Sequence, residues 1–113
     1  MNNNREPRVY VIKENSKLNY LDAERFGDIV FITNKNYSPI KNSLCNKEII
    51  QIIAEYMDQF DPGRDFLLLT GGPILIGYAF HLGIKKKGYI SLLQWDNLCR
   101  GYIPVQFNIE KGE

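Results

Sequence analysis

Apolar runs of strand length alternate with helical segments along this chain, and this alternation constrains the fold more than any other feature. Residues 8–13, 28–33 and 66–70 are rich in β-branched and aromatic residues. The 28–33 run is continuously apolar, which predicts a strand buried on both faces. Residues 89–95 and 102–109 predict an antiparallel hairpin. The whole pattern predicts an α/β fold, a small Rossmann-like layered domain with a mostly parallel sheet of about five strands.

Helical periodicity predicts the segments between these strands. Apolar residues recur at i, i+3, i+4, i+7, i+8 and i+11 from Ile49 to Phe60, and Asn46 before them is a predicted N-cap. Residues 19–26 form a shorter predicted helix, which Gly27 ends.

The predicted helix at residues 74–84 has no polar face, although Pro73 before it suits a first helical position. One side must pack on the sheet, and the other must be covered as well. We therefore expect a homo-oligomer that pairs through this helix, where Gly77 and Gly83 would allow close approach. The alternative is that the loop at residues 34–45 and the terminal hairpin cover it.

Size and composition fit one domain over residues 1–113, with the polar residues 1–7 expected to be flexible. Lys and Arg number 14 and Asp and Glu 13, a balance that argues against nucleic acid as a partner. The N-terminal residues lack the apolar region of a secretory signal, and the two cysteines form no CxxC pair. We expect a cytoplasmic protein with reduced thiols.

One apolar stretch, residues 66–84, has the length of a membrane span and contains no Asp, Glu, Lys or Arg. Gly71, Gly72 and Pro73 interrupt it, and such breakers leave backbone groups unsatisfied in lipid. A strand, a turn and a buried helix explain the same residues, so we expect no membrane partner.

The turn Thr70-Gly71-Gly72-Pro73 is the best candidate binding site, because it joins a strand to a helix N-terminus. Glycines let a ligand approach the backbone, and a helix N-terminus presents free N–H groups to an anion. Ligands of open α/β sheets bind beyond the carboxyl ends of the strands, so the loop after residues 28–33 should contribute. The predicted ligand-binding residues are Asn34, Lys35, Tyr37, Ser38, Thr70, Gly71 and Gly72.

These residues suggest roles without fixing a ligand. Lys35 could meet a phosphate, and Tyr37 or Trp95 could stack on a base. The glycine motif is neither GxGxxG nor a P-loop, so a plain strand-to-helix turn with close helix–sheet packing is the simpler explanation.

Catalysis has no support in the sequence. His81 is the only histidine, and no Ser or Cys partner stands at a recognisable spacing. Cys45 and Cys99 lack the spacing of a zinc site, and the carboxylates are scattered. We predict no catalytic residues, no metal site and no cofactor, which favours a non-enzymatic protein. An enzyme is the remaining alternative, and it would need a base, for which His81 is the residue to test.

The second half of the chain carries a resemblance. Asp65-Phe-Leu-Leu-Leu-Thr-Gly-Gly-Pro, then His-Leu-Gly and Ile-Ser-Leu-Leu-Gln-Trp-Asp, resemble small uncharacterised α/β proteins of phages and mobile elements. Asp22-Ala-Glu-Arg-Phe-Gly-Asp-Ile-Val-Phe is similar to the same proteins. The strand–turn–helix section is also similar to Rossmann-like sensor domains that bind signalling nucleotides. Since such proteins are largely uncharacterised, the resemblance implies little about function. If the chain is phage-encoded, we expect an accessory protein in the cytoplasm of the host cell.

Two binding functions remain open at this stage, beside the enzyme alternative. The first is binding of a small anionic ligand, a nucleotide or a nucleotide-derived signal, at the strand-end loops. The second is a phage-type interaction module that binds a host or viral protein through residues 74–84 or the terminal hairpin.

Overall fold

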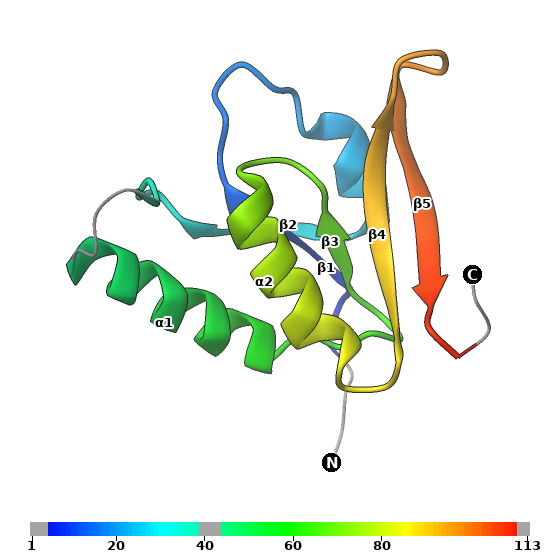
Figure 1. Cartoon of the computed structure of the whole chain (residues 1–113). Helices are drawn as coiled ribbons and strands as arrows, with labels where there is room; N and C mark the ends of the chain where they lie inside the picture. Colours follow the sequence, from blue (N-terminus) through cyan, green and yellow to red (C-terminus); the bar gives the residue numbers. More distant parts are fainter. Residues whose placement is uncertain (1–4, 39–43, 111–113) are drawn as a thin grey trace.

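One mixed sheet organises the molecule (Figure 1). The computed structural model describes residues 5–38 and 44–110. Within them, the sheet order is β2-β1-β3-β4-β5, with β1 to β4 parallel and β5 antiparallel to β4. The predicted α/β fold, mostly parallel with a C-terminal hairpin, is confirmed. The bounds are β1 (Arg8–Lys13), β2 (Asp28–Thr33), β3 (Phe66–Leu68), β4 (Tyr89–Asp96) and β5 (Gly101–Asn108).

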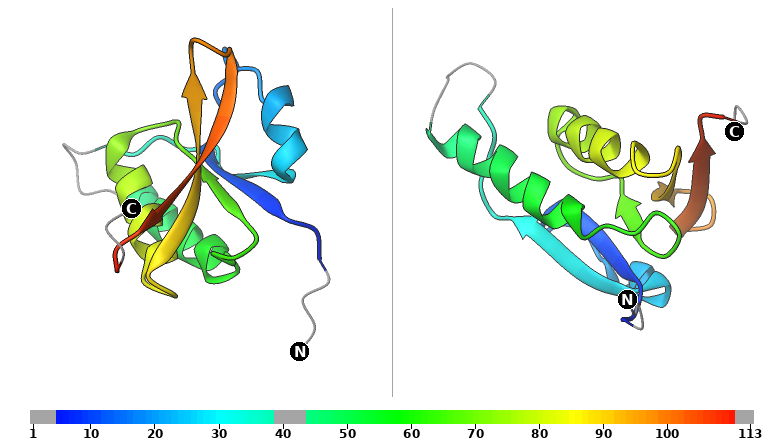
Figure 2. Two further views of the ribbon diagram at one scale, coloured as in Figure 1. Left: turned by 90° about the vertical axis from the view of Figure 1, so that its right-hand side faces the viewer. Right: turned by 90° about the horizontal axis from the view of Figure 1, so that it is seen from below.

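The helices cover the two faces of the sheet unequally. Figure 2 shows α1 (Leu44–Asp58) and α2 (Pro73–Ile84) on one face and the short 3-10 helix η1 (Leu21–Phe26) on the other. The larger core therefore lies between the sheet and the two α-helices, and a smaller one lies beneath η1.

Strand β1 lies inside the sheet, and its side chains enter both cores. Tyr10 and Ile12 pack toward α1 and α2, whereas Val9 and Val11 pack toward η1. All four are at most 1% exposed. Alternate side chains of a strand point to opposite faces, so a strand covered on both sides is apolar throughout.

The prediction that residues 28–33 are buried on both faces is wrong. Asp28 is exposed, Ile29 to Phe31 are half-buried, and only Ile32 and Thr33 are buried. The reason is that β2 is an edge strand, paired with β1 alone, so part of its surface meets solvent.

Helix α1 begins at Leu44, and the prediction that Asn46 is its N-cap is wrong. Asn46 lies within the first turn and is 6% exposed. Its side chain accepts a hydrogen bond from the Ser38 N–H at 2.9 Å and donates one to the Ser38 carbonyl at 2.6 Å. The amide therefore holds the loop after β2 against α1. Residues 39–43 of the predicted loop lie outside the described residues.

The short helix predicted at residues 19–26 is present as a 3-10 helix. The side chain of Asn19 accepts the Leu21 N–H at 2.9 Å, and Gly27 follows the last turn. A Cβ on Gly27 would come within 2.6 Å of the carbonyl oxygen of Pro7, the residue before β1. Only glycine therefore allows the two backbones to lie this close.

Helix α2 is covered largely from within the chain. It packs against α1 and β4, and Phe80 meets Phe107 of β5 with ring centroids 5.8 Å apart. Gly83 is buried, and a Cβ there would come within 2.7 Å of Ile90 Cδ1. Gly77 is exposed, with nothing within 4 Å of a Cβ. The apolar composition of α2 therefore does not require a second subunit, and the homo-oligomer stays a prediction.

The open edge of β5 is protected against pairing with another strand. The Tyr102 N–H donates to Asp22 Oδ2 at 2.6 Å, and the Tyr102 carbonyl accepts from Arg25 Nη2 at 2.9 Å. The hydrogen bond from Tyr102 and the nearby Arg25 guanidinium lower the pKa of Asp22.

Pro104 protects the next position along this edge. Pro104 lies opposite Leu93 of β4, and the Leu93 carbonyl accepts a hydrogen bond from the β3 side of the sheet. In an antiparallel pair, the backbone of Pro104 therefore faces away from β4, toward the open edge. Because proline has no N–H, this position offers no donor to another strand. Prolines and capped groups of this kind prevent edge-to-edge association.

A buried carboxylate ties together the amino ends of β1 and β3. Asp65 is fully buried and accepts two hydrogen bonds from Arg5, at 2.9 and 2.6 Å. It also accepts the N–H groups of Arg8 at 2.9 Å and Asp61 at 2.8 Å. Residues 1–4 of the segment predicted to be flexible lie outside the described residues.

None of the helices in the described part of the chain combines the length and apolar character needed to cross a membrane.

Candidate functional site

The loops after β1, β2 and β3 enclose a cleft of about 770 Å³, here called the strand-end cleft. Its walls are residues 12–16, 35–37 and 71–75. The chain goes from β1 to β2 on one side and later reaches β3 on the other side of β1 (Figure 1). The cleft therefore lies where the strand order reverses, the usual ligand position in open α/β sheets.

The structure brings part of the predicted site together here. Lys35, Tyr37, Gly71 and Gly72 line the strand-end cleft. Asn34 instead faces a neighbouring cavity of about 430 Å³ beside Thr33.

Two further predicted residues lie elsewhere. Thr70 lines a cavity next to Trp95. The backbone of Ser38 is held by Asn46, which supports the loop.

Sequence reasoning missed the first wall of the cleft. Lys13, Glu14, Asn15 and Ser16 contribute to it, although the sequence indicated only a polar loop there. The available signal was their position directly after the first strand, because parallel strands end at the same edge of the sheet.

The N-terminus of α2 opens into the cleft. Gly72 has φ −70° and ψ 137°, the extended conformation of an N-cap, and none of the described side chains caps the helix there. Pro73 has no N–H, so the available donors are the backbone N–H groups of Ile74 and Leu75, both of which line the cleft. Gly71 has φ 115°, which favours glycine.

Charged side chains surround this helix end unevenly. Lys13, Lys35 and Glu14 all line the cleft. Lys35 Nζ forms an ion pair with Glu48 Oε1 at 2.8 Å, and this hydrogen-bonded partner raises the pKa of Lys35. A ligand anion would therefore meet a charged Lys35 that it must share with Glu48.

A second group of cations lies at the other end of the strands, near the amino ends of β1, β3 and β4, around a cavity of about 320 Å³. Arg5, Arg64, Lys86 and Lys87 line it. Arg5 is bound to Asp65, while Arg64 and Lys86 donate to main-chain carbonyls. Most of these charges already serve the fold, so the cavity suits a ligand less well than the strand-end cleft.

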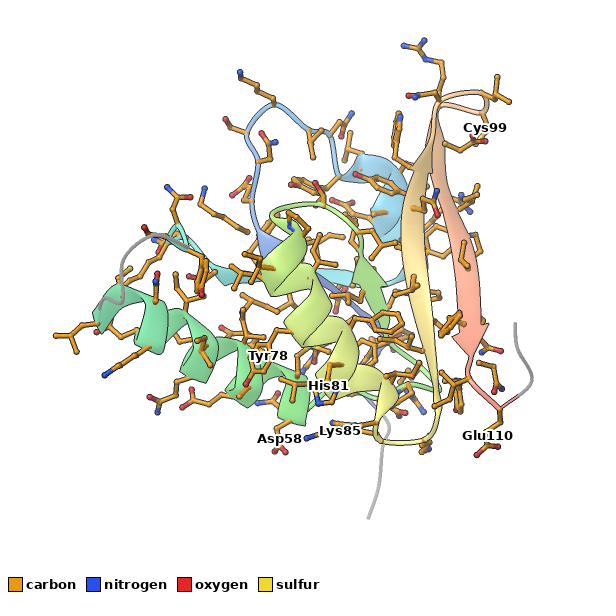
Figure 3. All side chains as sticks on the ribbon, in the orientation of Figure 1. Asp58, Tyr78, His81, Lys85, Cys99 and Glu110 are labelled. Atoms are coloured by element: carbon orange, nitrogen blue, oxygen red, sulfur yellow. The ribbon has the colours of Figure 1, made fainter. Side chains whose placement is uncertain are left out.

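The residues considered for catalysis lie apart. Figure 3 shows His81 on α2 near the end of that helix and Cys99 in the β4–β5 turn at the other end of the molecule. A hydrogen bond from Cys99 to Asp96 raises the pKa of this thiol, which makes it a poorer nucleophile.

The surface around His81 offers no assembled site either. Tyr78, His81 and Lys85 project from one side of α2, with Asp58 at the end of α1 (Figure 3). Across residues 5–38 and 44–110, no cluster of three or more His, Cys, Asp or Glu side chains could hold a metal ion. Both cysteines are free thiols.

Comparison with known proteins gives one finding. The model of a phage family, described as phage Pam3 gp32-like protein, matches residues 7–109, so the chain belongs to that family. The resemblance to phage proteins is thereby confirmed. No curated protein and no solved structure matches the chain.

Proposed function

We propose that this member of the phage Pam3 gp32-like family binds a small anionic ligand in the strand-end cleft and acts in the host cytoplasm without catalysing a reaction. A nucleotide or a nucleotide-derived signal is the ligand class. The observation that carries the proposal is the uncapped N-terminus of α2, which opens into a cleft lined by Lys13 and Lys35.

The chemistry of the cleft suits a phosphate. The N–H groups of Ile74 and Leu75 would donate to its oxygens, and the positive end of the helix dipole would favour its charge. Lys13 and Lys35 would neutralise the remaining charge. Tyr37, on another wall of the cleft, offers a ring for a sugar or base. The cleft volume of about 770 Å³ lies within the usual range for small-ligand sites.

Substitution of Gly72 tests anion binding directly, because a side chain there adds charge at the N-terminus of α2 without a steric clash. A Cβ at this position meets nothing within 4 Å, and its backbone suits an N-cap. In Gly72→Asp, the new carboxylate would cap α2 and occupy the anion position. We expect unchanged or slightly higher stability and, from charge repulsion, binding of AMP and inorganic phosphate weakened about tenfold or more.

The matched control is Gly72→Asn, which caps α2 without a charge. Isothermal titration calorimetry of the wild-type protein and both variants gives the comparison. Lys35→Gln should also weaken binding, whereas Lys47→Gln, exposed on α1 and outside the cleft, should not. Absence of phosphate and AMP binding to the wild-type protein, or equal binding by both Gly72 variants, contradicts the proposal.

A second candidate function, docking of a partner protein, rests on β5. Ile103, Val105, Phe107 and Ile109 are 36–58% exposed. Because side chains alternate along β5, the contact of Phe107 with Phe80 puts Ile103, Val105 and Phe107 on the α2 face of the sheet, and Ile109 follows the strand. An exposed apolar row of this kind favours a protein contact. Val105→Lys would then abolish binding to a phage or host protein while leaving phosphate binding intact, as measured by co-purification and calorimetry.

A further inference from the structure

A second cavity, here called the Trp95 pocket, lies at the carboxyl ends of β3 and β4. It encloses about 420 Å³ and is lined by residues 17–19, Leu69, Thr70, Trp95 and Tyr102. Tyr102 packs with Ala23 of η1, so the aromatic wall belongs to the η1 side of the sheet. The pocket is separate from the strand-end cleft, although Thr70 precedes Gly71 of that cleft.

The indole of Trp95 is held in place with part of its surface open. Its ring meets the Tyr102 ring edge-on, with centroids 5.1 Å apart and planes at 76°. Its N–H donates to Asn97 Oδ1 at 2.9 Å. Even so, Trp95 is 44% exposed, in contrast to Tyr102 at 3%. The contacts fix the orientation of the indole and satisfy its one donor, while the exposed part of the ring remains available to a ligand.

The opposite wall is also organised by hydrogen bonds. The side chain of Asn15 accepts the Lys17 N–H at 3.0 Å, and the Asn15 N–H donates to the Tyr20 hydroxyl at 2.9 Å. Asn19 is held through its bond from the Leu21 N–H. These local turns fix residues 17–19 opposite the aromatic wall, so the pocket is formed before any ligand enters.

We propose that the Trp95 pocket binds a flat heteroaromatic ring, such as a nucleobase, by stacking on the indole. Leu18 and Leu69 supply apolar surface, while Thr70, Asn19 and Lys17 supply polar groups for the ring edges. Stacking on an aromatic side chain accepts any base, because every base has a π face. The proposal is independent of anion binding in the strand-end cleft, since a neutral nucleoside is sufficient to test it.

The test uses the intrinsic fluorescence of Trp95, the single tryptophan of the chain. Adenosine is titrated into the wild-type protein, with excitation at the red edge of indole absorption, where adenosine does not absorb. We expect a saturable change in emission with adenosine and none with inorganic phosphate. By calorimetry, Trp95→Leu should weaken adenosine binding about 5- to 150-fold, and Trp95→Phe should retain part of it.

Two further variants keep the test decisive. Leu18→Asp keeps Trp95 and replaces part of the apolar lining of the pocket with a charged, strongly hydrated side chain, so it should weaken adenosine binding even if Trp95→Leu does not fold. Gly72→Asp should leave adenosine binding unchanged, which separates this site from the strand-end cleft. The proposal is overturned by an absent saturable signal, or by adenosine binding that Leu18→Asp leaves unchanged. It is also overturned if a tyrosine-containing peptide binds in preference to adenosine, because that result assigns the pocket to a protein partner.

Discussion

Replacing the buried carboxylate of Asp65 should destabilise the fold more than any surface change. Asp65 is fully buried and accepts four hydrogen bonds, two from Arg5 and two from backbone N–H groups. In Asp65→Ala, the N–H groups of Arg8 and Asp61 lose their acceptor, at about 1–3 kcal/mol each. The Arg5 side chain is 30% exposed, so water compensates part of its loss. We expect a decrease of about 3–5 kcal/mol in the free energy of unfolding.

Urea denaturation followed by circular dichroism measures this decrease. Asp58→Ala is the control, because it removes an exposed carboxylate at the end of α1 and should change stability by less than about 0.5 kcal/mol. Asp65→Asn keeps the shape and one acceptor oxygen, so it should fall between the two. A loss below about 1 kcal/mol in Asp65→Ala, at an unchanged m value, would refute the reasoning.

Three further predictions concern exposed positions. Gly77→Ala should stabilise the protein by about 1 kcal/mol in thermal or urea unfolding, because the site is open and helical; destabilisation would indicate a close contact there. Asp22 has a lowered pKa, so the stability from its bond to Tyr102 is present above the ordinary value of 3.8 and lost as the pH falls through its folded value. Asp22→Asn should therefore lower stability at neutral pH and matter less in acid, as urea unfolding at both pH values would show; an equal deficit at both contradicts this. Glu48→Gln frees Lys35 and should tighten phosphate binding up to about fivefold in calorimetry; weaker binding would contradict the role of Lys35.

The local pattern of the chain was sufficient for most of the fold. Residues 8–13 and 74–84 were predicted within a residue of β1 and α2, because strand-length apolar runs and a proline at the first helical position are local signals. The edge position of β2 could not be predicted from the local sequence. A continuous apolar run suits a central strand, and only the sheet order shows that β2 has a single neighbour.

The error at Asn46 has a similar cause. Asn at this position is a good cap by sequence, but tertiary contact with Ser38 uses its side chain, and α1 begins at Leu44. A local preference for a cap is readily overridden when the side chain has hydrogen-bond partners outside its own helix.

The candidate site was predictable only in part. Gly71 and Gly72 were predicted because glycines between a strand and a helix let a ligand approach the backbone. Lys35 was predicted because it lies in the loop that follows a strand. The wall from Lys13 to Ser16 was missed, since it carries no motif. The division between two cavities, with Thr70 facing Trp95 instead of the strand-end cleft, depends on how the loops fold over the sheet edge.

Amide chemical shifts in a ¹⁵N NMR titration test the central claim most directly. We expect inorganic phosphate and AMP to shift the amides of Ile74 and Leu75 at the N-terminus of α2, together with Lys35, in a saturable manner. Saturable shifts confined to Arg64, Lys86 and Lys87 at the other end of the strands, or no saturable shifts, would contradict anion binding in the strand-end cleft.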